Sequence, residues 1–527
     1  MGRDKIRLLV HTLKYLKFKQ VYFRLYYLIR NKCYKKPYSV LLSEDVKPLI
    51  WNDSFLYPNS FLGKNTFAFL NLNHPFDKGI DWNYPAFGKL WTYNLNYFDF
   101  LNQEQINTKD GLAFIKDYIQ NDAGLKDGKE PYPISLRGIN WIKFLSKKNI
   151  LDKEINQNLY NHYQILSHNI EYHLLGNHLL ENGFSLLFGA YYFQDDTFYK
   201  KAKKILLKEL KEQVLNDGAH FELSAMYHQI LFHRLLDCIN LVKNNPWKQK
   251  ELLLFLKEKA HKMLSWLQAV TYKNGNIPMV NDSAYNIAPQ SAQLFSYAKE
   301  LGLQWSTSKL SDSGYRKVEN NHFELFVDVG NVGPKYQPGH AHSDTFNFEL
   351  YVNEKPIIVD TGVSTYEKNN QRQIERSTAS HNTVKIGEYE QTQVWGGFRV
   401  AERAKITALK KMGQAIKATH NGYKKLNVLH TRKFIPENQS VIIQDTFSNK
   451  PKEETKAYLH FHPRIKKIEN KQNTISLVDE NIQIDLSEEA YKINVLEYDF
   501  AMGFNKTIKA KKVEIYFDTS LKTHIHF

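Results

Sequence analysis

The chain has almost no cysteine and no long apolar run. Among its 527 residues the two cysteines, Cys33 and Cys238, lie far apart in unlike contexts. A disulfide framework is therefore excluded, and the fold does not depend on an oxidising compartment. No stretch of about 18 apolar residues occurs, and the N-terminus lacks the apolar core and cleavage site of a secretory signal. We therefore expect a protein that is cytoplasmic or peripheral to the inner membrane.

Acidic residues are in the minority. The sequence has 55 Asp and Glu against 71 Lys and Arg, so its net charge is +16. This surplus indicates an anionic partner, which could be nucleic acid, an acidic membrane surface or an acidic polymer. Because zinc-finger spacings, RNA-binding aromatic motifs and basic helices followed by heptads are all missing, nucleic acid is the weakest of the three.

Residues 1–36 combine basic residues with apolar residues at helical spacing. Such a segment can lie on an anionic membrane, or it can pack on the protein with its lysines outward. We favour packing and keep peripheral membrane contact as the alternative. Residues 37–85 are rich in aromatic and turn residues. We group 1–85 as an N-terminal extension.

The spacing of apolar residues changes once along the chain. From about 138 to 304 it follows the helical period, with turn residues between successive segments. Antiparallel helix pairs of this kind stack into a solenoid or close into a toroid. After about 315 the period becomes two, which is typical of a large antiparallel β-sandwich. We therefore predict an α+β multidomain protein with a helical domain at 86–312 and a sandwich at 313–527.

A histidine pair stands where the period-two pattern begins. The sequence GHAHSD at 339–344 precedes an alternating run that predicts a strand over 346–352. His340 and His342 are two residues apart, so they share one side of this strand if it already begins there. With 20 histidines in the chain a close pair is expected by chance, and its neighbours therefore decide its meaning.

Two further short strands bring similar side chains. The run 357–362 predicts a buried strand that ends in Asp360, and 381–384 predicts another that begins with His381. Two or three imidazoles and one carboxylate on neighbouring strands are enough for a metal site, an acid/base site, or both.

Two stretches of the helical half carry polar residues that a simple bundle does not need. In GNHLLENG at 176–183, Asn177 could face a groove and donate to an anionic oxygen. In DGAHFELSAMYH at 217–228, Tyr227 could exchange a proton if its phenolate is stabilised. Singly, such residues are more often a helix cap and a core tyrosine. Together with the histidines of the other half they predict a cleft between domains.

Aromatic residues gather upstream. The sequence LWTYNLNYFDFL at 90–101 contains Trp91 and Tyr97 and indicates either a ligand-facing wall or a core cluster. In PYPISLRGINW at 131–141, Arg137 and Trp141 lie one helical turn apart. A guanidinium beside an indole would suit an acidic sugar.

Taken together, these motifs resemble the heparinase II/III-like polysaccharide lyases, which are related to alginate lyases of the same architecture. The resemblance covers nearly all of the chain after about residue 85. It rests on the order of GNHLLENG, DGAHFELSAMYH, GHAHSDTFNFELY at 339–351, VDTG at 359–362 and RSTASHNTV at 376–384. It implies an incomplete (α/α) toroid followed by an antiparallel β-sandwich, and a β-elimination on a glycan that contains uronic acid.

The resemblance also implies roles for the catalytic residues. Asn177 and His178 would neutralise the C5 carboxylate. Tyr227 would be the acid, and also the base when C5–H and leaving group are syn, whereas His340 would be the base when they are anti. For Tyr227 to act as a base, its pKa must be depressed. A nearby cation could lower this pKa by stabilising the phenolate. The candidates for this cation are His228, Arg137 and Arg376.

His342, Asp360 and His381 match the family's metal-binding positions and imply one divalent ion, expected to be zinc. We expect it to hold strands and orient His340, because elimination needs no activated water. The same ligands also form a catalytic zinc set, so hydrolysis stays open. Glu222 is expected to anchor the helix of Tyr227. The residues assigned to substrate binding are Trp91, Tyr97, Arg137, Trp141, His228 and Arg376.

Degradative lyases that meet extracellular glycans need an export signal, which is not found here. The N-terminal segment and the stretches 90–101 and 131–141 look more like heparinase-like proteins that accompany the synthesis of cell-surface polysaccharides. An acidic bacterial glycan, including one carried on a lipid, is therefore at least as fitting a substrate as heparin or heparan sulfate. The alternative function is a non-catalytic or hydrolytic acidic-glycan protein of polysaccharide assembly. Binding without catalysis would be salt-sensitive and indifferent to Tyr227→Phe and His340→Ala.

Overall fold

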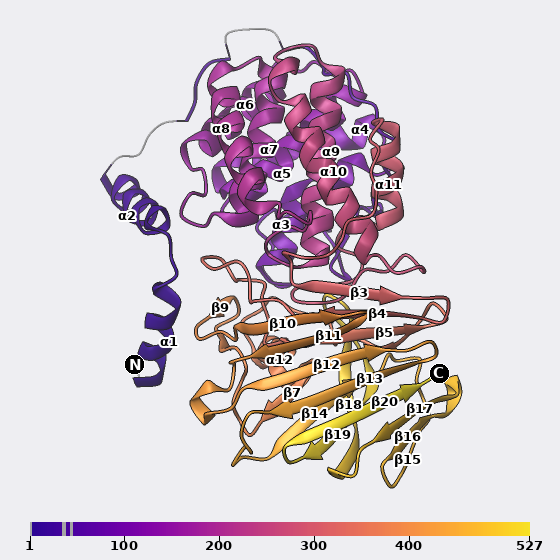
Figure 1. The fold of residues 1–527 in the computed structure, drawn as a ribbon. Helices are drawn as coiled ribbons and strands as arrows, with labels where there is room; N and C mark the ends of the chain where they lie inside the picture. The colour runs from indigo at the N-terminus through magenta and orange to yellow at the C-terminus, as the bar shows by residue number, and fades with distance from the viewer. Residues whose placement is uncertain (1–2, 34–37, 43–45) are drawn as a thin grey trace.

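The structure, a computed structural model, describes residues 3–33, 38–42 and 46–527. Figure 1 shows a helical body stacked on a body of β-sheets, with the first two helices running along one side of both. The helical body is built from α3 (Lys89–Tyr97), α4 (Thr108–Gln120), α5 (Pro131–Lys147), α6 (Lys153–His168), α7 (Gly176–Phe193), α8 (Asp196–Gln213), α9 (Ala225–Asn244), α10 (Leu253–Val270) and α11 (Ser291–Glu300).

Helix α7 is the centre of the helical body. Every residue of α7 except His178 is buried, and α5, α8 and α9 pack around it. Side-chain caps fix where neighbouring helices begin, because they satisfy backbone N–H groups that the first turn leaves free. Asp152 caps α6, Asp195 caps α8 and Ser224 caps α9.

The β-half contains three larger sheets, all antiparallel. One has the order β3-β4-β5-β6, one β18-β19-β14-β7, and the widest β10-β11-β12-β13-β20-β17-β16-β15. Apolar side chains from these sheets form one shared core. The strands that open this half are β3 (Tyr315–Glu319), β4 (Phe323–Asp328), β5 (Phe348–Val352), β6 (Lys355–Ile358) and β7 (Val384–Ile386).

The remaining strands complete the two other sheets and two small hairpins. They are β1 (Thr66–Phe69), β2 (Leu72–Pro75), β8 (Val394–Trp395), β9 (Arg399–Val400), β10 (Ile406–Met412), β11 (Ala415–His420), β12 (His430–Pro436), β13 (Ser440–Phe447), β14 (Thr455–His460), β15 (Ile468–Lys471), β16 (Thr474–Leu477), β17 (Ile482–Leu486), β18 (Ala490–Gly503), β19 (Lys506–Phe517) and β20 (Ser520–His526). The predicted order of a helical toroid followed by an antiparallel sandwich is confirmed.

The N-terminal arm consists of α1 (Arg3–Leu13) and α2 (Phe18–Cys33). It packs on the protein through one side: Tyr27 donates to the carbonyl of Ile170 at 2.6 Å, and Thr12 contacts the carbonyl of Val400 at 3.4 Å. Figure 1 shows α2 beside the helical body and α1 beside the sheets. Within the described residues, no helix combines the length and apolarity needed to cross a bilayer.

Candidate active site

The first site residue, Asn177, stands at the start of α7 because of the glycine before it. Gly176 has φ +58°, and a Cβ there would lie 2.6 Å from Oε1 of Glu222. Only glycine accepts both the left-handed backbone and this close approach. The backbone N–H of Asn177 then donates to Oε1 of Glu222 at 2.9 Å, and its side-chain amide donates to Oε2 at 3.0 Å.

Tyr227 lies in the first turn of α9. Ser224 caps this helix by accepting from the N–H of Tyr227 at 3.2 Å, and the same hydroxyl donates to the carbonyl of Asp282 at 2.8 Å. The Tyr366 hydroxyl donates to the Tyr227 hydroxyl at 3.3 Å. The rings of Tyr227 and His340 are 3.9 Å apart, so the phenol meets the imidazole of the other domain.

His340 and His342 occupy the loop between β4 and β5. The prediction of a strand that begins at 346 is wrong there, since β5 starts at Phe348 and Phe346 has φ +71°. The two imidazoles converge through Asp282 instead of through the pleat. Nδ1 of His340 lies 2.8 Å from Oδ2, and Nε2 of His342 lies 2.8 Å from Oδ1.

Asp282 is the residue on which this part of the site is centred. Arg372 binds both of its oxygens, with Nη2 at 2.7 Å from Oδ2, and both side chains are buried. Burial alone would raise the pKa of Asp282, but the Arg372 guanidinium and the two histidines outweigh it and hold the pKa well below its usual range. The carboxylate is therefore ionised, and it orients His340 so that Nδ1 carries the proton. Nε2 then faces Asn177 Nδ2 at 3.3 Å.

Sequence reasoning missed both Asp282 and Arg372. Asp282 falls between α10 and α11, in a segment without helical or strand periodicity. The sequence signal that could have indicated a buried Asp282 is its position close to the apolar Met279 and Val280. Arg372 stands one helical turn before Arg376, which was chosen in its place.

His178 is the one residue of α7 that is not buried. Its Nδ1 lies 3.1 Å from Oε1 of Glu171, and its ring lies 4.7 Å from that of Tyr132. Burial lowers the pKa of His178, but the Glu171 carboxylate outweighs it and raises the pKa above its ordinary value. The Glu171 carboxylate therefore favours the protonated form of the His178 imidazole beside Asn177.

The expected depression of the Tyr227 pKa is not found. Burial raises this pKa, the Asp282 and Glu222 carboxylates raise it further, and Arg372 opposes them. The cation near Tyr227 is thus Arg372, and the prediction of His228, Arg137 or Arg376 is wrong. Burial lowers the pKa of His228 to about 3, and its Nε2 lies 3.1 Å from the Met263 carbonyl.

Most residues assigned to substrate binding lie in the interior, so that prediction is contradicted for them. The indole of Trp91 donates to the Leu72 carbonyl at 3.1 Å, and Arg137 donates to the Asn96 carbonyl at 3.2 Å. Arg376 donates to the Ala341 carbonyl at 2.8 Å, between the two histidines. The residues that are at most 1% exposed are Trp91, Arg137, Trp141, His228 and Arg376. Of the two alternatives for the stretch 90–101, a ligand-facing wall or a core cluster, Trp91 fits the core cluster.

Tyr97 is also buried, although less completely than these residues. It is 7% exposed, and its ring lies 6.0 Å from that of Tyr132, which in turn contacts His178. Tyr97 thus belongs to a row of rings that leads to the site. Its predicted role in substrate binding stays a prediction.

The predicted metal ligands lie together and are buried. Nδ1 of His342, Nε2 of His381 and Oδ2 of Asp344 each have no hydrogen-bond partner in the part of the chain that the structure describes, and the two imidazole rings are 5.3 Å apart. Oδ2 of Asp360 lies 2.8 Å from Nδ1 of His381 and accepts from Asn347 at 2.6 Å. Within the described residues, no group of three His, Cys, Asp or Glu is arranged to hold a metal ion. The unpaired imidazole nitrogens fit a metal, and Asp360 is placed to orient His381.

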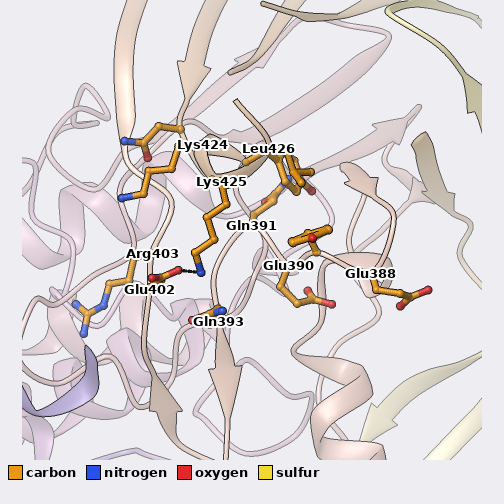
Figure 2. A pocket seen from close by; sticks show the side chains of 13 residues that line it. Glu388, Glu390, Gln391, Gln393, Glu402, Arg403, Lys424, Lys425 and Leu426 are labelled. Carbon is orange, nitrogen blue, oxygen red and sulfur yellow. Dashed lines mark ion pairs between the residues drawn. The ribbon is translucent and has the colours of Figure 1, made fainter. Parts of the chain in front are cut away.

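A cavity of about 160 Å³ opens elsewhere, on the sandwich. Figure 2 shows its charged lining, with Glu402 paired to Lys425 and Arg403 nearby. None of the site residues described above lines it. The cluster around Asn177, Tyr227 and His340 is therefore the candidate active site.

Known proteins match both halves of the chain. Residues 134–302 match the family model of the heparinase II/III N-terminus, and residues 304–526 match that of the heparinase II/III-like C-terminal domain. Two heparin-sulfate lyases are 25% identical: that of Bacteroides stercoris over 247 residues, 41% of this chain and 36% of that protein, and that of Bacteroides thetaiotaomicron over 227 residues, 35% and 32%. The chain thus spans about a third of the length of these relatives.

Solved structures share the fold. A heparinase III structure superposes with a TM-score of 0.65 at 16% identity, over 86% of this chain and 80% of that one. The heparan sulfate lyase of Pedobacter heparinus gives a TM-score of 0.58 at 17% identity, over 88% and 81%.

Proposed function

Because the chain belongs to the heparinase II/III-like family, we propose that it is a polysaccharide lyase that cleaves a uronic acid-containing glycan by β-elimination. One observation carries the proposal. An amide and a phenol from the starts of two helices meet an imidazole from a loop of the sandwich, with Asn177 Nδ2 3.3 Å from Nε2 of His340 and the Tyr227 ring 3.9 Å from the His340 ring. Such a convergence between domains has no structural need and suits a ligand cleft.

The first task is to acidify the C5 proton of the uronate. A proton next to a carboxylate is hard to remove while that carboxylate keeps its negative charge. Hydrogen bonds and a positive charge placed at the carboxylate stabilise the negative charge that develops as the proton leaves. Asn177 supplies a fixed amide, since Glu222 holds both its backbone and its side chain. His178 supplies the positive charge, which Glu171 maintains.

The second task is proton transfer. His340 is the base, because the Asp282 carboxylate accepts from Nδ1–H and leaves Nε2 with a lone pair, which faces the Asn177 amide at 3.3 Å. The same carboxylate stabilises the imidazolium that forms. Tyr227 is the acid toward the departing glycosidic oxygen, since its raised pKa keeps the phenol protonated. This division of roles corresponds to an anti arrangement of C5–H and leaving group.

The decisive experiment is an activity screen across uronate polymers, read by the ultraviolet absorbance of the unsaturated product. We expect Tyr227→Phe and His340→Ala each to lower kcat by about 100-fold or more, with unchanged thermal unfolding. Tyr366→Phe is the matched control, because it removes the neighbouring hydroxyl and keeps that of Tyr227. Product that incorporates water without a double bond would establish hydrolysis instead. Unaltered glycan that stays bound to Tyr227→Phe and wild type alike would establish a binding protein.

We also propose that one divalent metal ion, zinc by its donor set, binds His342 and His381 with Asp360. It would fix the loop that carries His340. The two unpaired imidazole nitrogens support this assignment, while the pairing of Asp360 with His381 leaves Asp344 as the competing carboxylate. Metal content of purified wild type, Asp360→Asn and Asp344→Asn tests it. Loss of metal in Asp344→Asn alone would transfer the ligand role to that residue, and metal-free wild type after reconstitution would refute the site.

A further inference from the structure

The outward face of the N-terminal arm is apolar and open to solvent. On α2 the exposed side chains recur at the spacing of one helix face. Their exposed fractions run from 43% for Val21 to 82% for Phe18. The residues of this stripe are Phe18, Val21, Tyr22, Leu25, Leu28 and Ile29, and on α1 the exposed Ile6, Val10 and Leu13 continue the pattern. Soluble proteins rarely leave a whole apolar helix face of this kind open to solvent without a partner.

The opposite face of the arm is already occupied. On α2, Gln20 donates to the Leu174 carbonyl at 3.2 Å, and Arg30 donates to the His168 carbonyl at 2.6 Å. On α1, Arg7 pairs with Glu402 at 3.2 Å, the carboxylate that Figure 2 shows with Lys425. These polar bonds fix the rotation of both helices. The apolar stripe therefore cannot turn into the protein without breaking them.

The charge of the arm identifies what covers the stripe. Residues 1–33 contain nine lysines and arginines and one acidic residue, Asp4. Lys5, Lys14, Arg24 and Lys32 are exposed, and Arg24 borders the stripe on α2. A helix with an apolar face and basic flanks lies in the interface of an anionic membrane, with its rings and aliphatic side chains at the acyl boundary. A soluble polyanion would use the basic residues but would leave the stripe uncovered.

We propose that the N-terminal arm docks the protein on an anionic lipid bilayer, with α2 lying in the plane of the surface. This goes beyond the proposed function, because it names a second partner for a surface outside the active site. The arm also contacts segments that adjoin the active-site residues in the chain. Its inner face contacts residues 168–174, which lead into α7 and Asn177, and Lys17 lies 3.8 Å from the ring centre of Tyr336, in the loop before His340. A bilayer on the outer face of the arm would therefore lie on the same side of the molecule as these two segments.

Co-sedimentation of the full chain with vesicles tests the proposal. The vesicles contain phosphatidylglycerol and phosphatidylcholine in equal parts, or phosphatidylcholine alone. We expect binding to the anionic vesicles only, weakened by salt. The double variant Leu25→Glu/Ile29→Glu should lose at least about tenfold in affinity, because it places carboxylates in the stripe. Leu254→Glu is the matched control, since Leu254 is 82% exposed on α10 in the helical body, and it should bind as wild type does.

Three results would overturn the proposal. One is equal sedimentation of wild type and the double variant, and another is absence of binding to anionic vesicles. The third is a dimer that the double variant disperses and that binds no vesicles, which would assign the stripe to a second copy of the chain. Lyase activity on a soluble uronate polymer is measured on the same samples. Because neither Leu25 nor Ile29 touches the site, vesicle binding and elimination can each fail while the other stands.

Discussion

The two halves of the molecule hold their parts of the active site in different ways. On the helical side, Asn177 and Tyr227 stand at helix starts that a glycine and a serine cap set locally, and Glu222 holds Asn177 from 45 residues away. On the sandwich side, His340 stands on a loop and is held by Asp282, 58 residues away. The helical side thus combines local helix-start rules with one tertiary contact, whereas His340 on the sandwich side has no local rule and depends on the buried Asp282 carboxylate. The two sides should respond differently to substitution.

The largest effect is expected at Asp282. Asp282→Asn leaves the Arg372 guanidinium without its anion and removes the group that orients His340. We expect kcat to fall by about 100-fold or more and the free energy of unfolding to fall by ~3–5 kcal/mol, measured by product absorbance and urea unfolding. Asp445→Asn is the matched control, because Asp445 is buried and pairs with Arg432 and His430. It should lose similar stability with kcat retained. Equal loss of kcat in both variants would contradict a specific role for Asp282.

The next effect tests the helical side. Gly176→Ala places a Cβ at the Glu222 carboxylate in a backbone with φ +58°, so it should displace Asn177. We expect a destabilisation of ~2 kcal/mol or more together with loss of most activity. Gly302→Ala shares the positive φ, +74°, but meets no atom within 4 Å. It should lose ~1 kcal/mol and keep full activity. Active Gly176→Ala would mean that the position of Asn177 is not needed.

A smaller effect concerns the charge of His178. Its pKa is raised in the folded protein, so the stability from the Glu171 pair is fully present below the ordinary histidine pKa of about 6.5 and is lost as pH rises through the folded value. We therefore expect KM for an acidic glycan to rise over the same interval above about 6.5. Glu171→Gln should move this rise to lower pH, and His178→Gln should remove it. A KM profile that is unchanged in both variants would exclude His178 as the cation.

The smallest effect is expected at a helix cap. Ser224→Ala removes the cap of α9 and the hydrogen bond to the Asp282 carbonyl. It should lower the free energy of unfolding by ~1 kcal/mol and reduce kcat a few-fold, because Tyr227 lies in the first turn. Asn107→Ala removes the comparable cap of α4, far from the site residues in sequence. This variant should lose a similar free energy of unfolding with no change in kcat. Equal kcat in the two variants would show that the Ser224 cap does not position Tyr227 for catalysis.

The failures of sequence reasoning follow the same division. The helical period predicted from about 138 to 304 does not show that α6 ends at His168 and that residues 169–175 form the loop that carries Glu171. Arg137 and Trp141 were expected to face a sugar because they lie one turn apart. That spacing is equally that of a buried helix face, and α5 is buried along nearly its whole length. The spacing of apolar residues shows that a helix face is apolar or mixed, but it does not show which part of the protein packs against that face.

What the sequence determined by itself was the class of each half and the local position of each motif. Apolar period, helix caps and the glycine before Asn177 act over a few residues, so they can be recognised in the chain alone. Only the tertiary structure decided that Asp282 and Arg372 hold His340, that Arg372 is the cation near Tyr227, and that the arm turns its apolar side outward. These depend on pairs separated by tens to hundreds of residues, and the burial that gives a charge its strength is a property of the folded packing.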